Sequence, residues 1–194
     1  MPVKDYLTKD EVRRLLDSVD DKADYLLIRM GLAIGPRVSE IIDIPLKNIE
    51  PDRIKLWDEK KNVYRDVIID SDTRGLLDLY LKRTWAERHR KGQVDDRHQR
   101  LFYMSAKTAN RILKHWFEVA KVPGEKAHWH TLRHTYVYQS LEAGVPISHL
   151  CAQTGDSVTV LINDYGMPTI DSRIEVMEDR GRYWESKDKS GVGH

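Results

Sequence analysis

The spacing of the apolar residues constrains the fold most, because it changes its period along one stretch only. Apolar residues recur at helical spacing before residue 45 and after residue 70. Between residues 53 and 69 they alternate with polar ones, and the polar, lysine-bearing segment 58–62 interrupts this alternation. Period-two alternation is typical of half-buried strands, and a short polar break joins two strands into a hairpin. The sequence therefore predicts a mainly α protein with a small antiparallel β-sheet, of the α+β class.

Capping residues and chain breakers place the helices. Thr8 and Glu11 have the spacing of a capping box, which predicts a helix over about 8–19. Helices are also expected over about 22–34 and in a short segment that stops before Pro45. Later helices are expected to begin near Ser71, Ser105, His130, Pro146 and Ser157, and a last amphipathic helix to cover about 169–185.

Length and composition exclude several classes of protein. A chain of 194 residues is expected to form one domain, and its 40% hydrophobic content suffices for a core. No apolar run approaches the roughly 20 residues that span a bilayer, and the N-terminus has no apolar signal region. The single cysteine, Cys151, excludes an internal disulfide framework. We therefore expect a cytoplasmic protein with no membrane partner.

Charge does not by itself indicate a nucleic-acid partner, because the formal net charge is only +1. The polar segment 86–100 combines five basic residues with three acidic ones and is expected to be a helix end followed by a loop. It is either a solvated surface or a contact with the DNA backbone. In the second case the contacts would come from Arg88, Arg90, Lys91, Arg97 and Arg100.

Two histidines and an arginine cluster at one helix start. His130 and Arg133 are three residues apart, so they share one face and can form a place for a phosphate or carboxylate. The alternative is a polar helix start with ordinary surface charges. A metal site built from His128, His130 and His134 is disfavoured, because Arg133 adds a positive charge and the usual glutamate is absent. No metal is expected.

Two further segments carry candidate functional residues. Arg37 follows a Gly-Pro turn at a helix start and can point at an anion, with Glu40 orienting it. An ordinary capping pair is the alternative. Tyr165 follows Asp156 by nine residues, and taken alone it is most simply a core or surface aromatic.

The order of these residues is more specific than any one of them. An arginine (Arg37), a hairpin lysine, the His130-x-x-Arg133 pair and Tyr165 follow one another along the chain. In this order the chain resembles the catalytic domain of the tyrosine recombinases, the phage integrase family. The similar segments are GPRVSEI, HTLRHT, TGDSVTVLINDYGMP and YLTKDEVRRLLDSV. The resemblance implies the tyrosine-recombinase catalytic-domain fold over residues 1–185, followed by a flexible tail at 186–194.

The resemblance also implies a reaction that needs no cofactor. Tyr165 would attack a DNA phosphodiester, forming a 3′-phosphotyrosine and releasing a 5′-hydroxyl, so that strands are cut and rejoined in site-specific recombination or integration. Arg37 and Arg133 would neutralise the phosphate. His130 would donate a hydrogen bond or help to deprotonate the tyrosine.

The remaining site residues follow from the same resemblance. A hairpin lysine would protonate the leaving oxygen. Counting back from Arg65 favours Lys60 over Lys61 for this role. His134 would be a buried supporting residue without a catalytic role.

Two departures from the family pattern qualify this interpretation. Asp156 stands where the family usually has histidine or tryptophan, and it is expected either to cap the helix from Ser157 or to pair with an arginine. The DNA-clamping domain that usually precedes the catalytic one is expected to be absent. A DNA-binding module of little or no activity and a type IB topoisomerase-like nicking enzyme are therefore the alternatives.

Double-stranded DNA is the expected partner, with assembly into a homo-oligomer on it. The helix at about 169–185 would either pack on a neighbouring protomer or fold back on its own domain. Its contacts would come from Ile170, Ile174 and Met177.

Overall fold

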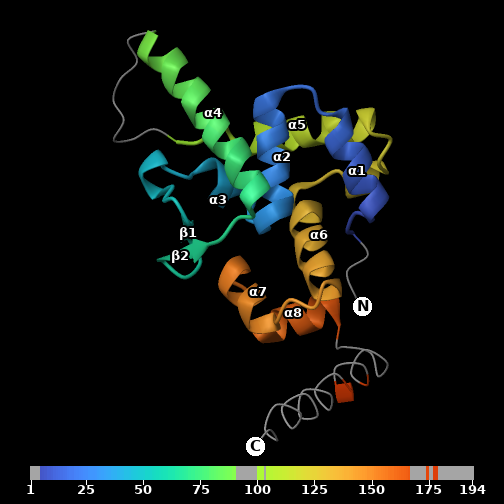
Figure 1. The fold of residues 1–194 in the computed structure, drawn as a ribbon. Helices are drawn as coiled ribbons and strands as arrows, with labels where there is room; N and C mark the ends of the chain where they lie inside the picture. The colour runs from blue at the N-terminus through green and yellow to red at the C-terminus, as the bar shows by residue number, and fades with distance from the viewer. Residues whose placement is uncertain (1–4, 91–99, 103, 167–173, 175–176, 179–194) are drawn as a thin grey trace, which may run out of the picture.

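The chain folds mainly into helices, with one small sheet, as the apolar spacing predicts (Figure 1). A computed structural model describes residues 5–90, 100–102, 104–166, 174, 177 and 178. The elements in chain order are α1 (Lys9–Ser18), α2 (Lys22–Ile34), α3 (Val38–Ile42), the 3₁₀ turn η1 (Leu46–Asn48), β1 (Ile54–Asp58), β2 (Val63–Val67), α4 (Ser71–Arg90), α5 (Ala106–Val119), the 3₁₀ turn η3 (Gly124–Lys126), α6 (Trp129–Glu142), α7 (Ile147–Thr154) and α8 (Val158–Tyr165).

Side-chain caps define the helix starts that the sequence predicts. Thr8 and Glu11 form the capping box of α1, and Ser105 accepts a hydrogen bond from the Thr108 amide at the start of α5. Helix α6 begins at Trp129, slightly earlier than expected, so His130 lies within its first turn. This earlier start keeps His130 and Arg133 one helical turn apart.

The hairpin connects β1 and β2 in antiparallel register. Ile54 pairs with Val67, and Trp57 pairs with Tyr64. The buried carboxylate of Asp58 accepts hydrogen bonds from the backbone amides of Lys60 and Lys61, which closes the turn. One face of the hairpin is buried, and β2 packs against α7 while β1 packs against α3.

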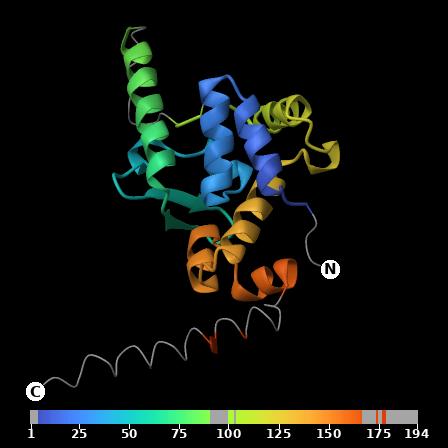
Figure 2. The same ribbon diagram turned by 45° about the vertical axis from the view of Figure 1, so that its right-hand side comes forward.

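The apolar residues form two cores of unequal size. The larger core lies among α1, α2, α5 and the first half of α6, where the Trp129 indole N–H also donates to the Pro36 carbonyl at 2.8 Å. Among the described residues, the smaller core has three fully buried members, Val137, Leu150 and Leu161. Figure 2 shows α7 and α8 at one end of the molecule, joined to the rest through α6.

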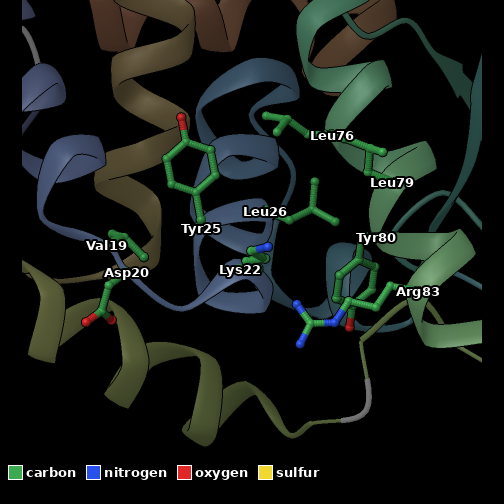
Figure 3. Close-up of a pocket in the computed structure, with 9 residues that line it drawn as sticks. All are labelled: Val19, Asp20, Lys22, Tyr25, Leu26, Leu76, Leu79, Tyr80 and Arg83. Atoms are coloured by element: carbon green, nitrogen blue, oxygen red, sulfur yellow. The ribbon is translucent and has the colours of Figure 1, made fainter. Parts of the chain in front are cut away.

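A cavity of about 420 Å³ lies between α2 and α4 (Figure 3). Its lining is largely apolar and includes Tyr25, Leu26, Leu76 and Tyr80. None of the candidate catalytic side chains contributes to it. A search of the described helices finds no segment with the length and apolar character of a membrane span.

Candidate active site

Arg133 is the most deeply buried cation of the predicted site. Its side chain extends from α6 with 6% of its surface exposed. The guanidinium donates to the carbonyls of Gly35 at 2.6 Å and Thr154 at 2.8 Å, and to the Asp156 carboxylate at 2.5 Å. These acceptors come from two segments far apart in sequence, so Arg133 fixes the α2–α3 turn and the α7–α8 turn relative to α6.

Arg37 approaches the same place from the α2–α3 turn. Its guanidinium donates to Glu40 at 3.0 Å and to Asp156 at 3.2 Å, and its backbone amide donates to Glu40 at 2.7 Å. The turn depends on Gly35, whose φ of +55° is in the left-handed region. A Cβ at this position would come within 2.6 Å of the Tyr136 ring. Glu40 therefore caps the start of α3 and also bonds to the Arg37 guanidinium.

Arg65 is a site residue that the sequence did not reveal as one. It points inward from β2 and forms a two-pronged ion pair with Glu40, at 2.7 and 2.8 Å. Its Nε also donates to the Gln153 carbonyl at 3.0 Å. The exposed side-chain fractions are 10% for Arg65 and 3% for Glu40. The only sequence signal was a charged residue on the inward-facing positions of a predicted strand.

Asp156 lies between the two predicted phosphate-binding arginines. One carboxylate oxygen accepts from Arg37 and the other accepts from Arg133. Ser157, not Asp156, caps α8 by accepting from the Val160 amide. Of the two roles expected for Asp156, the structure therefore shows pairing with arginine.

The two hairpin lysines differ in where their side chains lie. The Lys61 ammonium donates to the Gly155 carbonyl at 2.5 Å, directly beside Asp156. The side chain of Lys60 is exposed, and its backbone amide bonds to Asp58. In this structure the Lys61 side chain bonds to the α7–α8 turn, next to Asp156 in the sequence, and no such bond is seen for Lys60 among the described contacts.

Gly155 makes the approach of the hairpin possible. Its φ is +76°, and an added Cβ would lie 2.8 Å from an Asp58 carboxylate oxygen. The α7–α8 turn and the hairpin turn are therefore in direct contact at the site.

Tyr165 ends α8 and is partly buried beside the second core. Its hydroxyl lies 2.6 Å from Nδ1 of His134. Burial raises the pKa of Tyr165 above its ordinary value, Asp156 and Asp164 raise it further, and Arg133 opposes them. Burial likewise lowers the pKa of His134, assisted by the neighbouring His130. The pair therefore favours a protonated hydroxyl that donates to a neutral imidazole.

His130 lies on the exposed side of the same cluster. Its ring is 6.2 Å from that of His134, measured between centroids. Partial burial and the positive charge of Arg133 lower the pKa of His130, so this imidazole is also held toward its neutral form. The structure thus brings both histidines, Tyr165 and both arginines to one corner, where α6 meets the α7–α8 unit.

Other predicted residues lie elsewhere or outside the described chain. Arg100 is exposed and pairs with Asp43 at 2.8 Å. Arg88 and Arg90 belong to the last turns of α4, whereas Lys91 and Arg97 lie outside the described residues. In the predicted helix at 169–185, Ile174, Met177 and Glu178 have helical backbone and exposed side chains, and Ile170 lies outside the described part.

The histidines do not converge on a common ligand position. His128 lies against the Thr131 hydroxyl, at 3.3 Å from its nearer ring nitrogen, and His134 bonds to Tyr165. Across the described ranges, no three histidine, cysteine or acidic side chains are arranged to hold a metal ion.

The sequence and the fold match a known family. The model of the phage integrase family matches residues 5–164. The chain therefore belongs to the phage integrase family, and residues 5–164 are a tyrosine recombinase catalytic domain.

Curated relatives give the same result. Tyrosine recombinase XerC of Caldanaerobacter subterraneus subsp. tengcongensis is 32% identical over 137 residues, which are 67% of this chain and 37% of the relative. Tyrosine recombinase XerA of Saccharolobus solfataricus is 28% identical over 143 residues, 73% of this chain and 44% of the relative. The chain thus spans less than half the length of these relatives.

Solved structures confirm the fold. A crystal structure of XerA recombinase superposes with a TM-score of 0.71 at 22% identity, covering 93% of this chain and 66% of that one. The Tn1549 transposon integrase, solved in complex with transposon right end DNA, gives a TM-score of 0.70 at 19% identity, with coverage of 91% and 66%. The catalytic domain of bacteriophage HP1 integrase gives 0.59 at 20% identity, with coverage of 81% and 84%.

Proposed function

We propose that this chain breaks and rejoins double-stranded DNA in site-specific recombination, through a covalent bond between Tyr165 and a 3′-phosphate. The observation that carries the proposal is the convergence of Arg37 and Arg133 on one anion, beside α6, the helix whose His134 bonds to the hydroxyl of Tyr165. Family membership and the fold support it independently. No metal or nucleotide is required, because the phosphotyrosine retains the energy of the phosphodiester for rejoining.

The arginines would stabilise the charge that develops at phosphorus. Each guanidinium presents fixed N–H groups, and protein carbonyls and carboxylates already hold each of them in place. Donors that are oriented before the reaction need little reorganisation when negative charge accumulates on the phosphate oxygens. This preorganisation is the main contribution that we assign to the arginine pair.

Proton transfer from Tyr165 is the step that needs most help. A phenol with a raised pKa is a poor nucleophile, so its proton must pass to a base as the bond to phosphorus forms. His134 contacts the hydroxyl in this structure, and His130 lies beside His134. We propose that His134 orients the hydroxyl and receives its proton at Nδ1, and that His130, on the exposed side, faces the phosphate.

A lysine of the hairpin turn would protonate the leaving 5′-oxygen. The Nζ contact of Lys61 with Gly155 supports this residue, whereas the family pattern supports Lys60. Single alanine variants on DNA with a 5′-thiol leaving group separate the two, because a thiolate needs no proton. The lysine whose loss is rescued by the thiol is the general acid.

Covalent trapping tests the central proposal. The protein is incubated with fragmented DNA from its source, denatured with detergent, and the attached DNA is sequenced. Wild-type protein should retain DNA covalently and Tyr165→Phe should not, although both should bind it under native conditions. Adducts that persist in the Tyr165→Phe variant would contradict the assignment of the nucleophile.

The same samples test assembly on DNA. Duplexes with one and with two copies of the recovered site are compared by sedimentation. We propose that two protomers occupy the two-site duplex and one protomer the one-site duplex. The two-site complex should therefore contain the mass of one additional protomer.

A DNA-binding module without cleavage is the second candidate function. It is favoured by the raised pKa of Tyr165 and by the occupation of both arginines by Asp156. Native retention of DNA without adducts in the trapping experiment would select this function. Adducts accompanied by relaxation of supercoiled plasmid, but without strand exchange, would select a nicking enzyme.

A further inference from the structure

The carboxylate of Asp156 bridges the two arginines to which the proposed function assigns the DNA phosphate. Its two oxygens each accept from a different arginine, at 3.2 Å from Arg37 and 2.5 Å from Arg133. A phosphodiester likewise presents two unesterified oxygens to a pair of arginines. The carboxylate is 15% exposed, so an incoming anion can reach it from solvent.

We propose that Asp156 is an internal counter-ion which keeps the arginine pair correctly placed in the absence of DNA, and which a substrate phosphate must displace. This inference rests on the proposed function of the site and adds a property to it. Asp156 is thus a positioning residue that acts through Arg37 and Arg133.

The charges around the site support an exchange of anions. Three arginines pair with the three carboxylates of Glu40, Asp58 and Asp156, namely Arg37, Arg65 and Arg133. The Lys61 ammonium adds a positive charge at the Gly155 carbonyl. Of these three carboxylates, Glu40 and Asp58 are almost fully buried, with 3% and 2% of their side chains exposed. Asp156 is the most exposed of the three, and it alone bonds both predicted phosphate-binding arginines.

Without a counter-ion, the arginine pair would be unstable in its present position. Arg133 is almost fully buried, and a buried guanidinium that loses its anionic partner retains a desolvated charge. Arg133 would keep two carbonyl acceptors, and Arg37 would keep Glu40. Those contacts hold the side chains near the site, while the anion supplies the remaining stabilisation.

The backbone also allows the carboxylate to move. Asp156 is in the short turn between α7 and α8, directly after Gly155 at φ +76°. Its backbone amide donates to the Thr154 hydroxyl, so the residue can keep its place in the turn while its side chain leaves the arginines.

Anion-dependent stability of the Asp156→Asn variant tests the proposal without requiring catalysis. Asparagine keeps the shape of the side chain and removes its charge. Thermal unfolding of wild type and variant is followed over a series of inorganic phosphate concentrations, with chloride added to hold ionic strength constant. In the absence of phosphate, the variant should unfold at the lower temperature.

Phosphate should then reverse this difference. The variant should reach half of its phosphate stabilisation at a concentration on the order of tenfold lower than wild type, which lies within the usual range of coupling between linked binding equilibria. Asp164→Asn is the matched control, since it makes the same charge change in α8 and the Asp164 carboxylate bonds neither arginine among the described contacts. Its phosphate dependence should equal that of wild type.

A second variant identifies where phosphate binds. Adding Arg37→Gln to Asp156→Asn should abolish the gain in phosphate stabilisation. A structural role alone would lower the stability of Asp156→Asn equally at every phosphate concentration, and that result would overturn the proposal. So would a gain that survives the loss of Arg37.

Failure of this inference can be told apart from failure of the proposed function. Phosphate titration reports on the arginine pair alone, whereas covalent trapping reports on Tyr165. Adducts in the wild type combined with unchanged phosphate dependence in Asp156→Asn would refute the displacement and leave the DNA cleavage function standing. A shift of the phosphate dependence in Asp156→Asn, with no adducts in the wild type, would support the displacement and contradict the DNA cleavage function.

Discussion

The arginine half and the tyrosine half of the site are built differently. Arg37, Arg65 and Arg133 are held by carboxylates and carbonyls from several segments, and they stand on or beside the larger core. Tyr165 is held by one side-chain hydrogen bond and by a core with three fully buried members. The charged half is therefore preorganised, and the capacity to move is concentrated in α7 and α8.

The largest effect should come from breaking the charged half at its centre. Glu40→Gln leaves Arg65 and Arg37 without the carboxylate that both share, so the free energy of unfolding should fall by about 3–5 kcal/mol. Urea denaturation measures this value. The control Asp10→Asn breaks an exposed pair with Arg13 and should change stability by less than about 1 kcal/mol. Similar values for the two variants would show that the buried pair contributes little.

The two cores can be compared directly by the same truncation. Leu132→Ala in the larger core should lower the free energy of unfolding by about 2–5 kcal/mol, because the surrounding helices leave a cavity. Leu161→Ala should cost less and act locally, since α8 can relax around it. Hydrogen exchange is the sharper measurement. Leu161→Ala should accelerate hydrogen exchange at the amides of α7 and α8 and leave exchange in α2 unchanged. Faster exchange throughout the molecule would show that the two cores unfold as one cooperative unit.

A smaller loss of stability is expected when the contact between the hairpin and the α7–α8 turn is disturbed. Gly155→Ala should lower the free energy of unfolding by about 1–2 kcal/mol, because of its positive φ and the nearby Asp58 carboxylate. Gly75→Ala is the matched control, on an exposed position of α4 with open space around it. That change should instead stabilise the protein by about 0.5–1 kcal/mol. A neutral Gly155→Ala would mean that the turn shifts freely away from the hairpin.

The smallest effects concern the pH dependence of the tyrosine half. The pKa of His134 is lowered by folding, so the unfolded chain binds the proton more readily and stability should fall as the pH drops below about 6.5. The pKa of Tyr165 is raised, so its contribution should be lost as the pH rises above about 10. Unfolding midpoints at a series of pH values measure both slopes. His134→Asn should reduce the loss of stability at acid pH, and Tyr165→Phe should reduce the loss at alkaline pH. An effect of His134→Asn at alkaline pH only, or of Tyr165→Phe at acid pH only, would contradict these assignments.

Sequence reasoning found the parts of the fold that depend on local signals. The capping residues Thr8 and Ser105 and the alternation in the hairpin placed their elements correctly. The candidate site residues were predicted from the order of a few motifs along the chain. Their contacts could not be found in this way, because Arg65, Glu40 and Gln153 are far apart in sequence and meet only when the hairpin packs against both α3 and α7.

The hydrogen bond from Tyr165 to His134 was missed for a related reason. A spacing of 31 residues carries no periodic signal, and the bond depends on how α8 turns back toward α6. The choice between Lys60 and Lys61 likewise depends on the conformation of a hairpin turn, in which neighbouring side chains point in different directions. Long-range geometry, not residue chemistry, accounts for what the sequence did not reveal.

Because Arg37 and Arg65 share one carboxylate, the evolution of the sequence at these positions is constrained. Each oxygen of Glu40 accepts from both arginines, so the effect of a substitution at position 65 depends on what stands at position 40. Variants that are harmful singly are expected to become tolerable in combination. Relatives should therefore differ at positions 40 and 65 together, and a library that randomises either position alone will return almost only the parental residue.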